Sequence, residues 1–367
     1  MAQPEDNPAP APLDGEIDRE SRLRHASPTT AQLIRTACAV GLLLAVGACS
    51  SATSTPPAAL RVDPSISIVP GEIAASRLAP DLTASVVLVK PASGEVTTLT
   101  VASPGDALFF EGWADAQTVR LTTGHQARLF DIATKASSAV ANQPDQVAAN
   151  WDMVGTVTAF NLNAVDDQVW VSRTDPGAVP RAIDHGAEPH LSRDGQAVVY
   201  QTAAGLRSAK LSGGSPQLIS EGFGILSLAS DGGWSPDGAL IAYSDSGLGI
   251  SVTSLDGSAL KRIASVGSQD DHPTWSPDGA WVAFACGTQH AQICVVARDG
   301  GSVYQLTNEG VDSFLPTWSP DGTWIAFVRH MPDGSQPVWV IRRDGTGARQ
   351  VTTDGASYAA LAWRPSH

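Results

Sequence analysis

The sequence Trp-Ser-Pro-Asp-Gly at residues 275–279 decides how this chain folds, because the same five residues occur in it again. Identical copies begin at Trp234 and Trp318, which gives spacings of 41 and 43 residues. Proline presets φ for the second position of a turn, aspartate is tolerated next, and glycine accepts a positive φ at the end. Each copy therefore predicts a reversal of the chain. We expect the tryptophan before it to pack between neighbouring repeats.

Weaker copies extend this pattern in both directions along the chain. A degenerate copy, Leu-Ser-Arg-Asp-Gly, occupies residues 191–195, and a truncated one, Trp-Arg-Pro-Ser, occupies residues 363–366. Two fainter copies begin at Trp113 and Trp151, so that the seven starts lie 38 to 45 residues apart. A period near 40 residues is typical of repeat proteins in which each unit packs on the next.

Each copy is followed by the same succession of short segments. An apolar run comes directly after the turn, as at residues 280–284 and 323–327, and a second one follows at 293–297 and 338–341. Asp-Gly pairs of the kind that favours tight hairpins come next, at residues 256–257, 299–300 and 344–345. Four short strands in about 40 residues make one blade of a β-propeller.

The repeat resembles that of the TolB-type β-propellers, which also occurs in the propeller domains of prolyl oligopeptidase-type peptidases. The resemblance is strong over residues 189–367 and weak over residues 80–188. It implies an all-β fold of four-stranded blades. We expect seven blades, with six as the alternative. The last copy has no room for a whole blade, so pairing of N- and C-terminal strands would complete one and leave the ring without open edges.

The segment before the repeats predicts export. Residues 1–35 show no apolar period, and the apolar run at 37–48 is shorter than the roughly 20 residues of a membrane span but has the length of a signal-peptide core. Its end, Val-Gly-Ala before Cys49, resembles a bacterial lipobox. The resemblance implies that Cys49 becomes the lipidated first residue of the mature chain. An ordinary or an uncleaved signal peptide is the alternative.

These observations divide the chain into three parts. We predict a disordered region with a lipoprotein signal peptide at residues 1–48, a Ser/Thr/Pro-rich tether at 49–64, and the propeller at 65–367. The protein would then be exported and held at the cell membrane or envelope by the lipid on Cys49.

Two further cysteines, Cys286 and Cys294, flank an expected turn between two strands of one blade. A hairpin brings such positions together, and exported proteins fold in an oxidising compartment. The sequence therefore predicts a disulfide. A metal site with His290 is the alternative, although two cysteines and one histidine are an incomplete ligand set.

Composition and motifs restrict the function. The formal net charge of −14 argues against binding to nucleic acid, and 43% hydrophobic residues suffice for a core. Residues 233–237, Gly-Trp-Ser-Pro-Asp, lack the final glycine of a hydrolase nucleophile elbow. We predict no catalytic residue, no cofactor and no metal. The repeat residues are expected to serve the turns and the packing, namely Trp234, Asp237, Gly238, Trp275, Asp278, Gly279, Trp318, Asp321 and Gly322.

A group of polar residues precedes the repeats, in the segments expected to lead into the innermost strands. Its members are His190, Asp270, Asp271, His272, Asp312 and Ser313. They form either a solvated acidic rim or a contact surface, and Asp271 with His272 could bind a cation or act as acid and base. We therefore predict a non-catalytic, monomeric envelope propeller that binds a protein or cell-wall partner through this face. The alternative is an exported hydrolase or lyase acting on sugars or peptides, which needs acidic or histidine side chains within about 5–10 Å.

Overall fold

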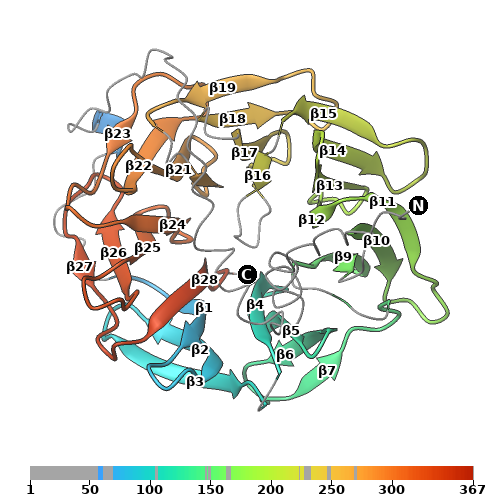
Figure 1. Ribbon diagram of the computed structural model, residues 1–367, viewed down its shortest axis with the longest axis horizontal. Coiled ribbons are helices and arrows are strands. Elements are labelled where there is room, and N and C mark those ends of the chain that lie inside the picture. The colour runs from blue at the N-terminus through green and yellow to red at the C-terminus, as the bar shows by residue number, and fades with distance from the viewer. Residues whose placement is uncertain are drawn as a thin grey trace, which may run out of the picture. The chain divides into compact units, whose positions relative to one another are not determined.

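The computed structural model describes part of the chain. The described residues are 57–60, 69–103, 106–144, 147, 150–162, 167–222, 224–226, 233–245, 249–267 and 271–366. All of them fall within one compact unit, Ala48–His367. Their strands form seven antiparallel four-stranded sheets around a ring (Figure 1). The predicted all-β propeller with seven blades is thereby confirmed.

Blade 1 joins the two ends of the propeller. From the centre outward its strands are β28 (Ser357–Trp363), β1 (Ile73–Leu78), β2 (Ala84–Lys90) and β3 (Glu95–Val101). Trp363 pairs with Ile73 across the closing strands. The predicted closure by N- and C-terminal strands is confirmed, and it gives β1 a partner on its inner edge.

Blades 2 to 4 follow in chain order. Blade 2 consists of β4 (Leu108–Trp113), β5 (Thr118–Thr123), β6 (Gln126–Asp131) and β7 (Ser137–Ala139). Blade 3 consists of β8 (Asp152–Val154), β9 (Val157–Leu162), β10 (Gln168–Arg173) and β11 (Arg181–His185). Blade 4 consists of β12 (Ala187–Leu191), β13 (Ala197–Thr202), β14 (Gly205–Lys210) and β15 (Gln217–Glu221).

Blades 5 to 7 contain the full copies of the repeat. Blade 5 consists of β16 (Gly224–Leu226), β17 (Ile241–Asp245), β18 (Ile250–Thr253) and β19 (Lys261–Ala264). Blade 6 consists of β20 (Asp271–Trp275), β21 (Trp281–Cys286), β22 (Gln292–Ala297) and β23 (Tyr304–Gln305). Blade 7 consists of β24 (Ser313–Trp318), β25 (Trp324–Arg329), β26 (Val338–Arg342) and β27 (Arg349–Gln350).

The Ser-Pro-Asp-Gly turns connect the innermost strand of a blade to the second strand, as predicted. In blade 6 the Ser276 hydroxyl donates to Asp278 at 2.5 Å and accepts from the backbone N–H of Trp281 at 2.9 Å. Gly279 closes the turn with a φ of 67° and an N–H bond to the Ser276 carbonyl. Both polar side chains are thus used by the turn.

The Asp-Gly turns between the outer strands differ from the expectation of two-residue hairpins. In blade 6 the N–H of Gly300 donates to the carbonyl of Ala297, which places the glycine at the fourth position of a turn, with a φ of 77°. The next ladder pair joins Val295 to Tyr304, well beyond the turn. The outermost strand β23 begins several residues after the turn, so the connection from β22 to β23 is longer than a two-residue hairpin.

The core is divided among the interfaces between blades. Each of seven hydrophobic clusters of described residues combines side chains from two neighbouring blades. The motif tryptophans contribute to them as predicted: Trp234, Trp275 and Trp318 are each at most 5% exposed. Burial of these large rings between sheets supplies much of the driving force for closing the ring.

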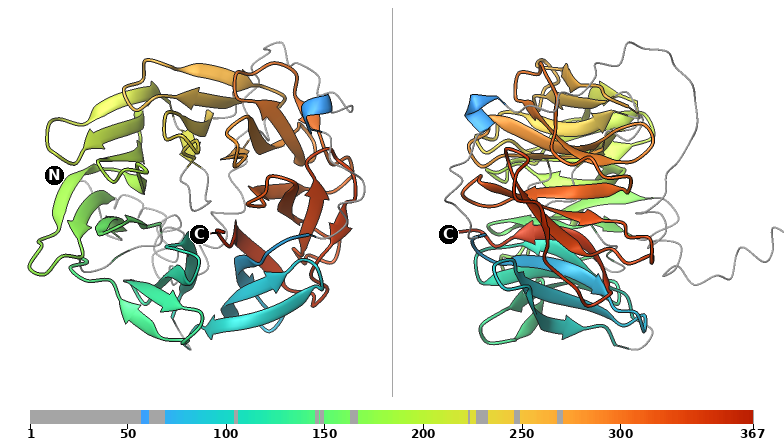
Figure 2. Two further views of the ribbon diagram at one scale, coloured as in Figure 1. Left: turned by 180° about the vertical axis from the view of Figure 1, so that it is seen from behind. Right: turned by 90° about the vertical axis from the view of Figure 1, so that its left-hand side faces the viewer.

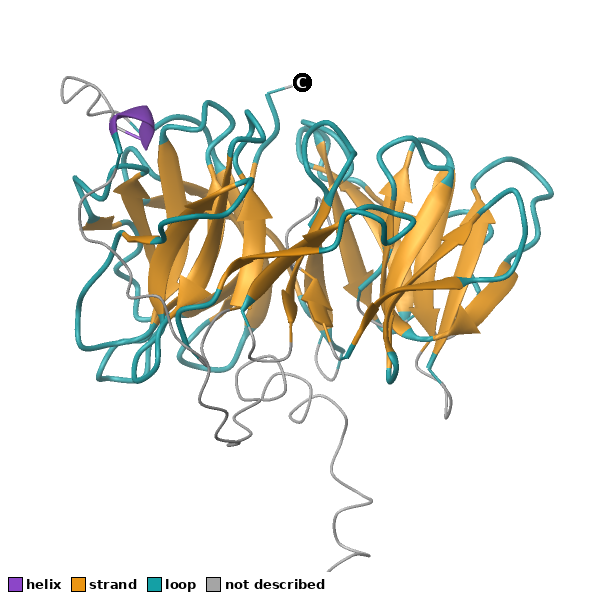
Figure 3. Cartoon of the chain, turned by 90° about the horizontal axis from the view of Figure 1, so that it is seen from above, coloured by secondary structure: helices purple, strands orange, loops and turns teal. Residues whose placement is uncertain are grey.

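The propeller has two faces, which Figure 2 and Figure 3 show from the side. We call the turn face the one where the innermost strands end in the motif turns and where the described chain ends at Ser366. We call the loop face the opposite one, where the innermost strands begin. A single turn of 3-10 helix, η1 (Ala58–Leu60), lies at the turn face. Within the described part of the chain, no helix has the length and hydropathy that a membrane span requires.

Candidate functional site at the loop face

The innermost strands of blades 4, 6, 7 and 1 share an unusual residue near their loop-face ends. Three positions before the motif, Glu188, His272, Leu315 and Ala360 have φ values of 50° to 54°. The pairing register shifts at the same points. A left-handed conformation costs a residue with a Cβ about 1–2 kcal/mol. Four blades therefore carry this backbone strain at equivalent places, where a bulge changes the direction in which the side chains of the strand point.

Glu188 supplies a carboxyl group at one of these positions. Gln201 on the neighbouring strand donates from Nε2 to Glu188 Oε2 at 2.6 Å. Burial, and to a lesser extent the nearby charge of Asp271, raise the pKa of Glu188 to about 7. A carboxyl group with such a pKa exchanges a proton near neutral pH, which is the property of a general acid or a proton-sensitive contact.

Asp271 and His272 stand on the corresponding stretch of blade 6. The carboxylate of Asp271 lies 3.2 Å from His272 Nδ1 and accepts the backbone N–H of His272 at 2.7 Å. Both side chains are partly exposed, 30% for Asp271 and 17% for His272. The structure thus brings two predicted site residues together as a carboxylate–imidazole pair, in electrostatic reach of Glu188.

His190 lies on β12, directly before the blade 4 motif. Burial lowers its pKa to about 4, so the imidazole is neutral at ordinary pH. Its Nδ1 is enclosed and finds no partner among the described residues. His190 does not occupy the position equivalent to His272, which is three residues before the motif: in blade 4 that position is Glu188, and His190 lies two residues further along the strand.

A buried ion pair supports the strand that carries His190. Arg120 Nη1 of blade 2 contacts Asp152 Oδ1 of blade 3 at 2.5 Å, and it also donates to the Trp151 carbonyl at 2.8 Å. The second oxygen of Asp152 accepts the N–H of Leu191 in blade 4 at 2.8 Å. Two side chains therefore link three consecutive blades. Nothing in the motif pattern indicated this pair.

Asp312 and Ser313, the remaining described site candidates, are used by the fold. Asp312 accepts the N–H of Ala291 at 2.9 Å and lies 3.3 Å from His290 Nδ1, with both side chains exposed. Ser313 is completely buried, and its hydroxyl lies 3.3 Å from Arg329 Nε. Ser313 is therefore not accessible to a partner, whereas Asp312 lies at the surface. Asp270 and Cys49 lie outside the described residues.

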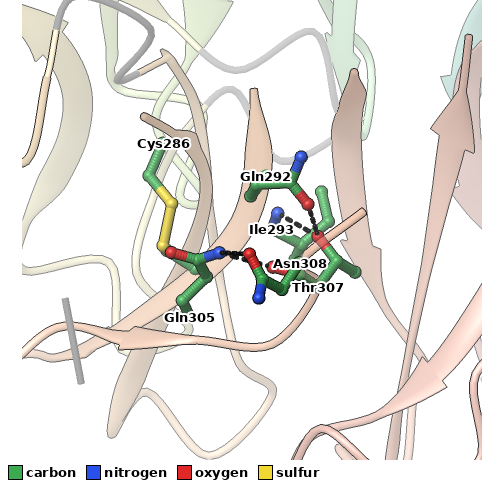
Figure 4. Close-up of a disulfide and its surroundings, with 7 residues drawn as sticks. Cys286, Gln292, Ile293, Gln305, Thr307 and Asn308 are labelled. Carbon is green, nitrogen blue, oxygen red and sulfur yellow. Dashed lines mark hydrogen bonds between the residues drawn. A yellow bond between two sulfur atoms is a disulfide. The ribbon is translucent and has the colours of Figure 1, made fainter. Parts of the chain in front are cut away.

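The predicted disulfide joins Cys286 to Cys294 in blade 6 (Figure 4). It crosses from β21 to β22 and is buried, with both cysteines at most 1% exposed. A neighbouring buried bond runs from Thr307 Oγ1 to Gln292 Oε1 at 2.8 Å. Because the sulfurs are paired, the alternative of a metal site with His290 is wrong, and no cluster of metal ligands occurs among the residues that the structure describes.

The loop-face rim can be summarised by its chemistry. It combines the carboxyl groups of Glu188, Asp271 and Asp312 with the imidazoles of His272 and His290; Glu188, Asp271 and His272 lie on inner strands, and Asp312 and His290 lie in adjoining loops. Sequence reasoning missed Glu188, although a signal was available: it has the same distance of three residues from its motif as His272. Such a rim suits a partner that offers hydrogen-bond donors or positive charge, and the proximity of carboxyl groups also permits acid–base chemistry.

Comparison with known families gives a match for the C-terminal part of the chain. Residues 230–367 match the family described as the TolB beta propeller domain. This range contains the three full copies of the motif. A search of curated proteins finds no match.

Solved structures resemble the whole propeller. TolB from Acinetobacter baumannii is 15% identical with a TM-score of 0.54, over 81% of this chain and 67% of that one. A puromycin-hydrolyzing peptidase from Mycobacterium tuberculosis is 13% identical with a TM-score of 0.55, over 84% and 57%. An oligogalacturonate lyase from Vibrio parahaemolyticus is 13% identical with a TM-score of 0.50, over 71% and 88%. At these identities the likeness shows a shared fold alone.

Proposed function

Because this chain is a seven-bladed β-propeller of the TolB type, we propose that it is an exported, lipid-anchored envelope protein that binds a protein or cell-wall partner through its loop face. It would act as a monomer and without catalysis. The observation that carries the proposal is the loop-face rim, in which Glu188 and His272 occupy left-handed positions at equivalent places on two inner strands.

The rim supports partner binding because it is both varied and rigid. At the equivalent positions Glu188 supplies a carboxyl group and His272 an imidazole, whereas Leu315 and Ala360 pack against the hydrophobic clusters between blades. Strain of this kind persists only where the surrounding structure enforces it. A surface that is ordered before it meets its partner loses little entropy on binding.

The disulfide and the N-terminal sequence support export. A buried disulfide between neighbouring strands is typical of proteins that fold outside the reducing cytosol. The apolar run at 37–48 and Cys49 have the pattern of a lipoprotein signal. The likeness to TolB from Acinetobacter baumannii does not identify a partner for this chain. The proposal therefore defines the partner only by the chemistry that the loop face would bind.

Site-specific photocrosslinking in cells tests the binding face. A crosslinking residue at exposed His290 on the loop face should yield a defined adduct, whereas one at exposed Ala280 on the turn face should not. Asp271→Ala should weaken the adduct at His290. Equal adducts at both faces, or an adduct that Asp271→Ala leaves intact, would count against the loop-face proposal.

Fractionation of cells tests the anchor. The wild-type chain should be found with membranes and the Cys49→Ala variant should not. If both are exported and soluble, the lipid attachment is wrong, while the loop-face proposal can still be judged by crosslinking.

An enzymatic function is the second candidate, and one observation favours it. Glu188, whose pKa burial raises to about 7, lies in electrostatic reach of Asp271, an arrangement that can divide acid and base roles between two carboxyl groups. Purified protein would be incubated with cell-wall glycans and with peptides. Product formation that Glu188→Gln abolishes while the fold is retained would establish the enzyme and overturn the non-catalytic proposal.

A further inference from the structure

The chain makes a contact with the ring before its first strand begins. Leu60, at the end of η1, is completely buried and belongs to the hydrophobic cluster between blades 6 and 7, together with Trp281, Trp318 and Phe327. The N–H of Leu60 donates to the Pro57 carbonyl at 2.9 Å, which closes the single helical turn. This contact lies at a different interface from the one that the chain enters next, because β1 belongs to blade 1.

The burial of Leu60 is energetically significant. Removing a leucine side chain fully from water favours the buried state by about tenfold to a hundredfold or more. The sequence predicts a flexible tether over residues 49–64. Fixing such a segment costs conformational entropy, and the burial of Leu60 is large enough to offset that cost. The helical turn therefore spends most of its time docked in the cluster.

The position of η1 determines from which face of the propeller the N-terminal segment leaves. Figures 2 and 3 both place η1 on the turn face, on the same side as the end of the described chain. The rim with Glu188 and Asp271 lies at the opposite face, where the inner strands begin. A chain held at Leu60 thus leaves the propeller from the face that the proposed partner does not use.

We propose that residues 57–60 are a latch that fixes the lipid tether to the turn face, so that the anchored protein holds this face toward the membrane and its loop face away from it. The proposal rests on the lipid attachment at Cys49. Pro57 lies eight positions after Cys49, which limits the reach to about 29 Å, whereas Val69 lies 20 positions after it, which would allow about 72 Å. The latch therefore shortens the free tether as well as orienting it.

Trypsin cleavage tests the latch without any lipid. Arg61 follows Leu60 directly and is the sole basic residue between Arg35 and Arg77, so cleavage there yields a unique new N-terminus at Val62. In the full chain with Cys49→Ala, Leu60→Ala should raise the rate of this cleavage at least about tenfold, because proteolysis follows the population of the undocked form.

Leu82→Ala is the matched control, because Leu82 is 76% exposed and undergoes the same chemical change. It should leave cleavage after Arg61 at the wild-type rate. Circular dichroism and the thermal midpoint of each variant would show that the propeller itself remains folded. A Leu60→Ala rate equal to that of wild type would overturn the latch, whatever the state of the lipid.

Energy transfer to a membrane tests the orientation. The lipidated full chain, with a fluorescent residue at exposed Ala280 on the turn face or at His290 on the loop face, would be placed in vesicles of phosphatidylethanolamine and phosphatidylglycerol with a rhodamine-labelled lipid. Transfer from position 280 should exceed transfer from position 290, and Leu60→Ala should remove the difference. Equal transfer in the wild type would overturn the orientation.

The two tests separate this inference from the proposed function. If the wild-type protein does not bind the vesicles and Cys49→Ala behaves alike, the lipid attachment fails, and the orientation fails with it. The trypsin result then still decides whether residues 57–60 are docked. If vesicle binding depends on Cys49 but cleavage does not depend on Leu60, the anchor stands and the latch is wrong.

Discussion

Blades on the two sides of this ring are joined by different polar contacts. Four interfaces share one hydrogen bond: the motif tryptophan of one blade donates its Nε1–H to the backbone carbonyl just before the motif of the preceding blade, at 2.8 to 3.2 Å. These are the interfaces between blades 5 and 6 (5/6), 6/7, 7/1 and 1/2, and the donors are Trp275, Trp318, Trp363 and Trp113. At the interface 2/3, Trp151 donates instead to Leu121, and the ion pair of Arg120 with Asp152 is added. At 3/4, Leu191 replaces the tryptophan and its backbone bonds to Asp152.

The difference shows what a repeat must keep and what it can exchange. Every interface retains a hydrophobic cluster, so the apolar contact is common to all blades. The polar link varies: four interfaces have a neutral tryptophan hydrogen bond, interface 2/3 has the buried charge pair, and at interface 4/5 Trp234 Nε1 finds no acceptor among the described residues. A buried pair is more costly to break than a neutral bond, because the remaining charge stays away from water. The blades with the weakest sequence signal therefore carry the most vulnerable contact.

The largest effect is expected from breaking the buried pair. Asp152→Ala should lower the free energy of unfolding by about 3–5 kcal/mol, because Arg120 would remain buried without its partner and Leu191 would lose an acceptor. Urea denaturation followed by tryptophan fluorescence measures this change.

Asp175→Ala is the control for this prediction. Asp175 pairs with Arg173 in the same blade, but both side chains are about half exposed. Its removal should cost less than about 1 kcal/mol. Equal effects of the two substitutions would show that burial of the Arg120 pair does not set its contribution.

The next largest effect concerns pH and two residues of blade 4. Glu188 has a pKa raised to about 7, so between its ordinary value of 4.5 and 7 the folded state retains a proton that the unfolded state releases, and stability falls as pH rises. His190 has a pKa lowered to about 4, so between 4 and its ordinary 6.5 the unfolded state binds more protons, and stability rises with pH. The two slopes oppose each other between pH 4.5 and 6.5.

Single substitutions should reveal the two slopes. Glu188→Gln should leave a stability that increases from pH 4 to 6.5, and His190→Gln one that decreases from pH 4.5 to 7, each by up to about 3 kcal/mol. Urea unfolding at a series of pH values measures both. If each variant shows the wild-type profile, the two groups do not titrate as their burial implies.

A smaller effect should separate two motif tryptophans. Trp318→Phe removes the bond from Nε1 to the Thr274 carbonyl and should cost about 1 kcal/mol more than Trp234→Phe. Trp234 Nε1 is buried and has no acceptor among the described residues, so phenylalanine loses no bond there. Thermal unfolding of the two variants makes the comparison. A larger cost at Trp234 would contradict this, because it would mean that Trp234 Nε1 donates a hydrogen bond in the folded protein.

The smallest effect is expected at the turn face. Arg298 Nη1 lies 2.7 Å from Asp237 of the previous blade and its guanidinium lies over the Trp275 ring, but the aspartate is half exposed. Arg298→Ala should cost about 1 kcal/mol or less. The difference from wild type should shrink in high salt, which differential scanning calorimetry can follow.

Most of the fold could be predicted because the motif fixes local geometry. Ser276, Asp278 and Gly279 form their turn from interactions within a few residues, so the pattern alone identifies where each inner strand ends. Closure through β28 also followed from the leftover strands at both ends of the sequence. Blade 3 departs from the pattern: Val154 pairs directly with Val157, so a two-residue turn with Gly155 replaces the motif turn.

The candidate site was less predictable because it depends on contacts between blades. Asp271 and His272 were found from their place before a motif, and the structure pairs them. Ser313 has the same kind of place but is completely buried, because it pairs with Arg329 of the neighbouring strand and that side chain lies 3.3 Å from its hydroxyl. Arg120 and Asp152 are 32 residues apart and belong to different blades, so no local pattern could bring them together.

Closure of blade 1 by β28 also determines when the protein can become a ring. The strand that pairs with β1 is Ser357–Trp363, at the far end of the propeller sequence. A chain that emerges N-terminus first, from a ribosome or through a membrane pore, must therefore wait with β1 unpaired on its inner edge until residue 363 has arrived. During that interval the exposed edge is a site for mispairing, and any helper that shields it would need to release the chain only after its last strand has emerged.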